Sequence, residues 1–237
     1  YFFDKLEKAN YFFNYIAKTN NHNLHSLKKY SFDDLKLISF LDNPTNDGGQ
    51  WIIICNLIKK YGLIPKSNMD DNFHSKNSSE LSNFFNDFLR KSAFKIRNST
   101  NKKKIIDELL NDCYKILVLF LGEPPKKITW QYYHKNKNKN KNKTKKVQKV
   151  IESISPLDFY KKIVPFDLDN KVCLINYPCD DVDYYKLYNV ENQYSILGEK
   201  NAHYLNVPIN DMIECSKKSI DNEEAIWCGV DFNKYNS

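Results

Sequence analysis

Hydrophobic positions return every three or four residues through the first half of the chain, a spacing typical of helices with one buried face. Five stretches show it, at residues 1–18, 31–41, 51–61, 79–97 and 102–121. Gly62 with Pro65 follows the third stretch and Gly122 with Pro124 follows the fifth, and such residues end helices. The first half therefore predicts helices, and the last two are apolar enough to pair as a hairpin.

Past Pro125 the pattern changes to the alternation of apolar and polar residues that is typical of strands. Ile128, Trp130 and Tyr132 alternate with polar neighbours, as a half-buried strand does. Further strands are predicted at residues 172–175, 187–194 and 224–232, with helices beginning at 155 and at 208. Helices first, then mixed strands and helices, predict an α+β fold.

The same patterns carry two expectations about burial. In the first helix, Lys5, Glu7 and Lys8 lie opposite the aromatic residues and are expected to face solvent. Trp51 and Trp227 lie inside apolar runs, so burial is expected for both indole rings rather than contact with a ligand.

Length and composition narrow the function classes. With 237 residues, 41% of them hydrophobic, the chain can bury a core without disulfides. It has 6 Gly and no glycine-rich phosphate loop, which makes a nucleotide site improbable. The 6 Cys show no CxxC pair and most lie in apolar runs, so we expect reduced thiols, a reducing compartment, no metal and no cofactor. No apolar run approaches the length of a membrane span.

One segment carries the net positive charge. Residues 135–149 (KNKNKNKNKTKKVQK) hold 8 Lys and no acid, whereas the whole chain has a net charge of +7. Only Arg90 and Arg97 supply the guanidinium fork that specific readers of nucleic acid use. We expect a disordered surface tract here, a tolerated insertion, with weak binding of polyanions as the alternative.

The stretch NPTNDGGQW precedes the third helix and contains the candidate binding residues. Asp47 can cap this helix, and Gly48 and Gly49 leave the backbone open to close approach. From these residues alone, a plain turn at the entry to a helix is the favoured interpretation.

Several segments together resemble bleomycin hydrolase and aminopeptidase C, a branch of the papain-like cysteine peptidases. They are YFFDKLEKANYFF, NPTNDGGQW, KYGLIPK, GEPPKKITW, SPLDFYKKIV and EAIWCGVDFNK, which follow one another in family order across nearly the whole chain. The resemblance implies a papain-like fold, here incomplete and with a helical insertion. It divides the chain into a helical lobe at 1–66 with the glycine loop, a helical insertion at 67–126 and part of the barrel lobe at 127–237.

The resemblance also implies the chemistry. Family members are thiol peptidases that hydrolyse peptide bonds with a Cys-His-Asn set, in which a thiolate attacks the scissile carbonyl. The family's Cys lies before the segment like YFFDKLEK, and its His and Asn lie after the segment like WCGVDF. No catalytic residue is therefore expected within these 237 residues, and the isolated chain is expected to be inactive.

By the same resemblance, Asp47, Gly48 and Gly49 correspond to the loop that binds the substrate backbone. The family further implies peptide substrates, a homohexamer, non-specific nucleic-acid binding by a helical insertion, and a cytoplasmic location without membrane attachment. The alternatives are a non-catalytic relative and a polyanion-binding module that uses the Lys/Asn tract.

Overall fold

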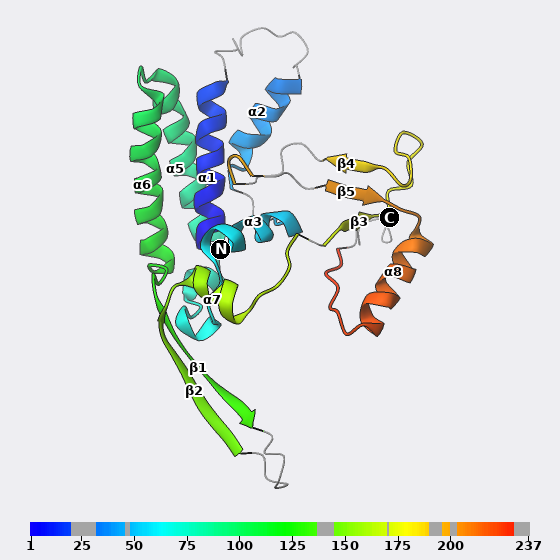
Figure 1. The fold of residues 1–237 in the computed structure, drawn as a ribbon. Helices are drawn as coiled ribbons and strands as arrows, with labels where there is room; N and C mark the ends of the chain where they lie inside the picture. Colours follow the sequence, from blue (N-terminus) through cyan, green and yellow to red (C-terminus); the bar gives the residue numbers. More distant parts are fainter. Residues whose placement is uncertain are drawn as a thin grey trace. The chain divides into compact units, whose positions relative to one another are not determined.

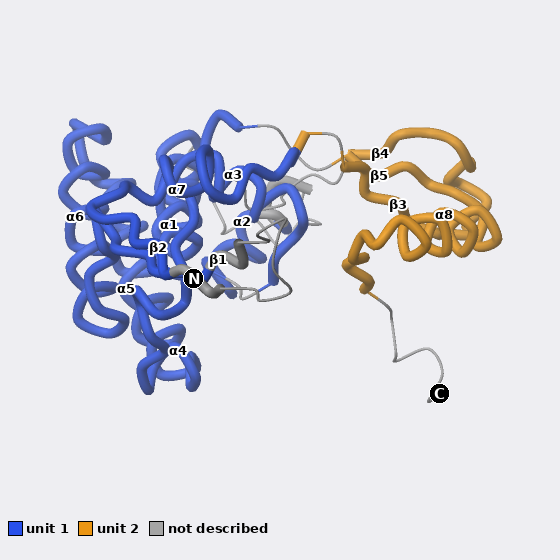
Figure 2. Tube along the Cα trace, turned by 60° about the horizontal axis from the view of Figure 1, so that its bottom comes forward, with its two compact units in different colours: residues 1–168, 193–200 blue, residues 169–192, 201–237 orange. Residues whose placement is uncertain are grey.

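The computed structural model describes residues 1–19, 32–45, 48–136, 145–169, 171–189, 196–199 and 203–229. The chain forms two compact units, which Figure 2 distinguishes by colour. Unit 1 comprises residues 1–168 and 193–200, and unit 2 comprises residues 169–192 and 201–237.

Unit 1 is built mainly from helices (Figure 1). Its elements are α1 (Phe2–Lys18), α2 (Phe32–Asp42), α3 (Trp51–Tyr61), the short 3-10 helix η1 (Lys66–Asn68), α4 (Phe73–Lys76), α5 (Ser79–Asn98), α6 (Lys102–Leu121), β1 (Ile128–Asn136), β2 (Lys145–Ile154) and α7 (Pro156–Ile163). The five predicted helices are all present, and α3 and α6 have the predicted bounds.

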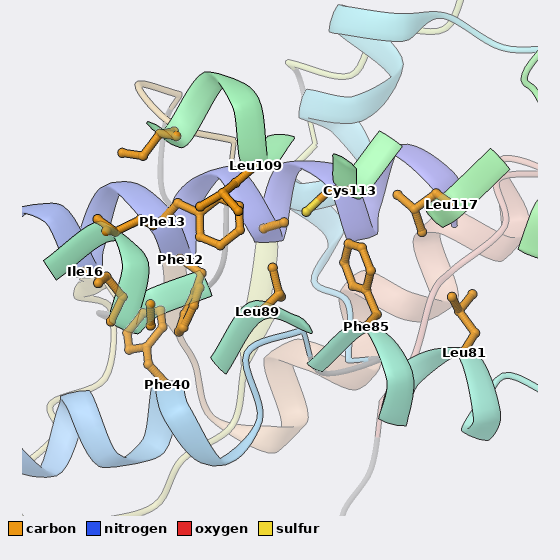
Figure 3. Packing of buried hydrophobic residues seen from close by; sticks show 14 of the residues in the cluster. Phe12, Phe13, Ile16, Phe40, Leu81, Phe85, Leu89, Leu109, Cys113 and Leu117 are labelled. Atoms are coloured by element: carbon orange, nitrogen blue, oxygen red, sulfur yellow. The ribbon is translucent and has the colours of Figure 1, made fainter. Parts of the chain in front are cut away.

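The core of unit 1 lies between α1, α2, α5 and α6. Figure 3 shows side chains from all four helices pointing toward one another. Phe12, Phe13 and Ile16 of α1 are fully buried there, and Phe85 of α5 and Cys113 of α6 are fully buried in the same cluster. Because α5 and α6 form the predicted hairpin and also supply this core, the hairpin is integral to unit 1.

Strands β1 and β2 pair as an antiparallel hairpin that extends away from the helices of unit 1 (Figure 1). The register places Lys135 opposite Lys146 and Asn136 opposite Lys145. Residues 135–136 and 145–149, at the two ends of the Lys/Asn tract, thus belong to strands, and disorder of the tract as a whole stays a prediction. Residues 137–144 lie outside the described part of the chain.

Unit 2 contains a small mixed sheet and one helix. Its elements are β3 (Cys173–Ile175), β4 (Leu187–Asn189), β5 (His203–Asn206) and α8 (Ile209–Asp221). β5 is central, parallel to β3 and antiparallel to β4. The Asn206 side-chain amide is buried and donates to the carbonyl oxygens of Tyr177, Val182 and Asp183 at 3.2, 3.1 and 3.3 Å.

Two expectations near the end of the chain are wrong. Residues 224–229 form no strand, and Trp227 is 60% exposed instead of buried. A strand requires a partner for its backbone groups, and the apolar run around Trp227 has none among the described strands. By contrast, Trp51 is half-buried, next to Phe166.

The two units do not coincide with the three segments expected at 1–66, 67–126 and 127–237. The roles assigned to those segments, cleft lobe, insertion and barrel lobe, stay predictions. None of the helices in the described part of the chain is long and apolar enough to cross a membrane.

Candidate functional site

The candidate site is the loop that joins α2 to α3. Gly48 and Gly49 are both exposed, and a Cβ atom built on Gly49 meets no atom within 4 Å. Asp47 lies outside the described residues, and the N-cap position of α3 is Gln50. The expectation that Asp47 caps the helix is therefore corrected, because α3 begins at Trp51, too far along the chain for that role.

Two buried lysines of α1 bind the backbone of this loop. The ammonium group of Lys5 donates to the carbonyl oxygen of Thr45 at 2.5 Å, and that of Lys8 donates to the carbonyl oxygen of Gly48 at 3.0 Å. Lys5 and Lys8 are 0% and 2% exposed. The prediction that both face solvent is wrong, because the loop covers this side of α1 and its carbonyl oxygens accept the ammonium protons.

Helix α5 binds the loop at its beginning. The Thr45 hydroxyl donates to Oδ1 of Asn86 at 2.7 Å, and Nδ2 of Asn86 donates to Oδ1 of Asn43 at 3.3 Å. Arg90 donates to the carbonyl oxygens of Leu41 and Asp42 at 2.8 and 2.6 Å, at the end of α2. The start of the loop is thus attached to two core helices, α1 and α5, whereas the space beside Gly49 is open.

The far end of α3 is fixed by a close approach to α7. A Cβ atom at Gly62 would lie 2.2 Å from the carbonyl carbon of Pro156, and Gly62 has a φ of 79°. The Glu7 carboxylate accepts from Lys60 at 2.6 Å and from the Tyr61 hydroxyl. Burial, followed by this bond to Glu7, raises the pKa of Tyr61. The far end of helix α3 is therefore held by contacts with both α7 and α1.

An apolar cavity of about 350 Å³ lies in unit 1 beside α1 and α3. Its walls include Phe3, Ile58, Tyr61, Leu121 and Pro156. Neither Gly48 nor Gly49 lines it, so this cavity is distinct from the open side of the glycine loop.

Neither Cys113 nor Cys173 is an activated nucleophile. A catalytic thiol requires a lowered pKa, but burial raises the pKa of Cys113, with Asp112 adding to the effect, and burial also raises the pKa of Cys173. Cys55 is buried, and no Cys forms a disulfide in the described ranges. Within those ranges no cluster of His, Cys, Asp and Glu could bind a metal ion.

Lys5 and Lys8 are the residues at the candidate site that sequence reasoning missed. Their spacing gives a weak signal, since both fall near the buried Ala9 and Phe12 on the helical wheel, but a charged residue at such a position is ordinarily assigned to the surface.

Comparisons with known proteins cover the whole chain. A model of the Peptidase C1-like family matches residues 1–237. Aminopeptidase C of Listeria monocytogenes is 35% identical over 235 residues, which are 97% of this chain and 49% of that protein. Bleomycin hydrolase of Homo sapiens is 31% identical over 245 residues, covering 99% of this chain and 50% of that protein.

One solved structure provides the matching fold. The crystal structure of PepW from Lactobacillus rhamnosis gives a TM-score of 0.79 at 31% identity, covering 94% of this chain and 48% of that one. The chain thus spans about half the length of the relatives it matches.

Proposed function

This chain belongs to the Peptidase C1-like family, and from that premise we propose that it supplies the substrate-binding part of a cysteine-type aminopeptidase. The predicted resemblance to aminopeptidase C and bleomycin hydrolase is confirmed, and so is the α+β, papain-like fold class. The reaction proposed is hydrolysis of peptide bonds at the amino end of peptides.

In the proposed mechanism, the thiolate, the histidine base and the orienting asparagine come from outside these 237 residues. The thiolate attacks the scissile carbonyl carbon, the carbonyl oxygen takes up the negative charge, and the protonated histidine donates to the leaving amine. The chain's own contribution is the loop of Asp47, Gly48 and Gly49, which binds the extended substrate backbone as an added strand. Glycine suits this role because no Cβ blocks the approach of another backbone.

One observation carries the proposal: a family match over the full chain coincides with an exposed glycine pair whose outer side is open. A glycine pair packed beneath side chains would have argued against substrate binding. Peptide substrates, a homohexamer and a cytoplasmic location belong to the same proposal.

The test is to express the full-length gene product and to assay a fluorogenic aminoacyl amide with and without a thiol-alkylating reagent. We expect hydrolysis that alkylation abolishes. A folded full-length product without thiol-dependent hydrolysis would favour a non-catalytic relative.

The 237 residues alone are expected to show no hydrolysis of the same substrate, because the covalent step lacks an activated thiol. Circular dichroism on the same sample checks that the helices are present. Thiol-dependent turnover by the purified chain would refute this prediction.

A second candidate function, binding of polyanions, is favoured by the hairpin register. Pairing of β1 with β2 brings Lys135 opposite Lys146 and thereby concentrates positive charge at one end of the hairpin. The test is retention on heparin as salt increases, with and without residues 135–149. Equal retention of both proteins would remove this candidate.

A further inference from the structure

The buried ammonium group of Lys8 fixes the direction of one loop carbonyl. It donates to the Gly48 oxygen at 3.0 Å and pairs with the Asp4 carboxylate at 2.8 Å. The Lys8 side chain is 2% exposed, and a charged donor gives a stronger hydrogen bond away from water. The Gly48 carbonyl is therefore directed toward α1.

This carbonyl determines where the next amide points. The peptide bond between Gly48 and Gly49 is trans and planar, so its C=O and N–H groups point in opposite directions. Because the Gly48 oxygen faces Lys8, the Gly49 N–H faces away from α1. On the outer side of the loop, Gly49 is exposed and a Cβ atom there meets nothing within 4 Å.

Without the hydrogen bond from Lys8, the peptide plane between Gly48 and Gly49 could adopt other orientations. Glycine adopts positive and negative φ about equally well, so a plane between two glycines can rotate at low steric cost. Rotation by half a turn would point the Gly48 oxygen outward and the Gly49 N–H inward. The outer side would then offer an acceptor where a bound peptide's carbonyl group requires a donor.

We propose that Lys8 is a positioning residue that keeps the Gly49 N–H turned outward, where it donates to a backbone carbonyl of a bound peptide. This inference rests on the proposed function, because it assigns Lys8 a role in peptide binding. The positive charge also polarises the Gly48 peptide group and makes the Gly49 N–H a better donor. Lys5 acts elsewhere, at the Thr45 carbonyl where the loop begins.

Three variants of the full-length gene product test the role of Lys8. Lys8→Met removes the charge and the donor but keeps an unbranched chain, and Lys8→Arg keeps a cationic donor. Lys60→Met is the matched control. Lys60 of α3 forms an ion pair at 2.6 Å with Glu7, which lies on α1 as Lys8 does, but away from the glycines.

Steady-state kinetics on a fluorogenic dipeptide amide separate positioning from a merely structural role. We expect Lys8→Met to raise KM about three- to tenfold with kcat little changed, as for the loss of one hydrogen bond to the substrate. Lys8→Arg should restore KM, and Lys60→Met should leave it unchanged. A lower kcat with an unchanged KM in Lys8→Met indicates loss of folded enzyme and overturns the inference.

Crystal structures of the parent and of Lys8→Met show the orientation of the Gly48–Gly49 peptide plane, a measurement that does not depend on enzymatic activity. We expect the Gly48 oxygen to face Lys8 in the parent, and to be rotated or to occupy two orientations in the variant. An unchanged peptide plane in the variant overturns the inference. Absence of thiol-dependent hydrolysis by the parent is a separate result that contradicts the proposed function and leaves the crystallographic comparison decisive for Lys8.

Discussion

Gly62 shows how one missing side chain determines the packing of two helices. It lies at the end of α3 with a positive φ, and the backbone of Pro156 occupies the space of a side chain. The Leu63 amide donates to the Pro156 carbonyl oxygen at 3.1 Å, which adds a direct bond between the two segments. Any residue other than glycine must therefore displace α7 or the end of α3.

Gly62→Ala is expected to lower the free energy of unfolding by about 2–5 kcal/mol, the sum of left-handed strain and overpacking. The matched control is Gly122→Ala, where φ is also positive but a Cβ atom meets nothing within 4 Å. That variant should lose only about 1–2 kcal/mol, from strain alone. Urea denaturation of both variants measures the difference, and equal losses would contradict the packing argument.

The cysteines differ in reactivity because they differ in burial. Cys113 is fully buried and its pKa is raised, so its thiol stays protonated at neutral pH, whereas Cys179 and Cys215 are exposed. We expect iodoacetamide at pH 8 to label the exposed thiols of Cys179, Cys215 and Cys228 and to spare Cys113 until urea is added. Peptide mass mapping identifies the sites, and early labelling of Cys113 would show that the core opens readily.

At the scale of the element, Ser155 begins α7. Its hydroxyl oxygen accepts from the Asp158 amide at 3.1 Å and its hydroxyl donates to the Asp158 carboxylate at 2.7 Å. The hydrogen bond from Lys162 and then that from Ser155 lower the pKa of Asp158. The sequence pattern predicted a helix beginning at 155, and the structure confirms it, with Ser155 as the N-cap and Pro156 as the first helical residue.

Ser155→Ala should destabilise the protein by about 1 kcal/mol near pH 7. A carboxyl group with a lowered pKa stabilises the fold above its unfolded pKa of about 3.9, and this contribution is lost as pH falls through the folded pKa. The difference in the free energy of unfolding between parent and variant should therefore become smaller below about pH 4. It should not vanish, because the Ser155 hydroxyl oxygen still accepts from the Asp158 amide. Thermal unfolding of parent and variant near pH 7 and below about pH 4 measures this difference, with Ser67→Ala, at an exposed position, as the control.

Helix bounds could be predicted from the sequence where the chain carries its own stop signals. Gly62 and Gly122 end α3 and α6, and both helices have the predicted bounds. The short strand β5 was missed because a strand of 4 residues depends on partners distant in sequence. At the candidate site, the sequence predicted that Gly49 leaves the backbone open to approach. It did not predict the burial of Lys5 and Lys8, because charged residues are ordinarily assigned to the surface.

At the scale of the whole molecule, the division into two units means that a substitution in one unit mainly affects the stability of that unit. Unit 2 depends on Asn206, whose buried amide joins β5 to the segment containing Tyr177 and Asp183. The Tyr177 amide in turn donates to Oδ1 of Asn206 at 2.9 Å. One side chain thus satisfies several backbone groups that the short sheet leaves unpaired.

Asn206→Ala is expected to destabilise unit 2 by about 2 kcal/mol, because the backbone carbonyl groups of Tyr177, Val182 and Asp183 lose the donor that this buried amide supplies. Hydrogen exchange followed by mass spectrometry should show faster exchange in β3, β4 and β5, with little change in α1, α5 and α6. Asn189→Ala, at an exposed position of the same sheet, is the control. Equal acceleration in the helices of unit 1 would contradict the division into units.

The hairpin of β1 and β2 also affects how copies of the molecule behave in concentrated solution. In the described part of the chain neither strand has a second neighbour, so both edges present backbone groups that another strand could bind. Exposed lysines such as Lys149 of β2 repel an approaching copy while ionic strength is low. Salt screens this repulsion over distances of about 10 Å at 0.1 M, so the protein should be stored in dilute buffer to keep it from aggregating.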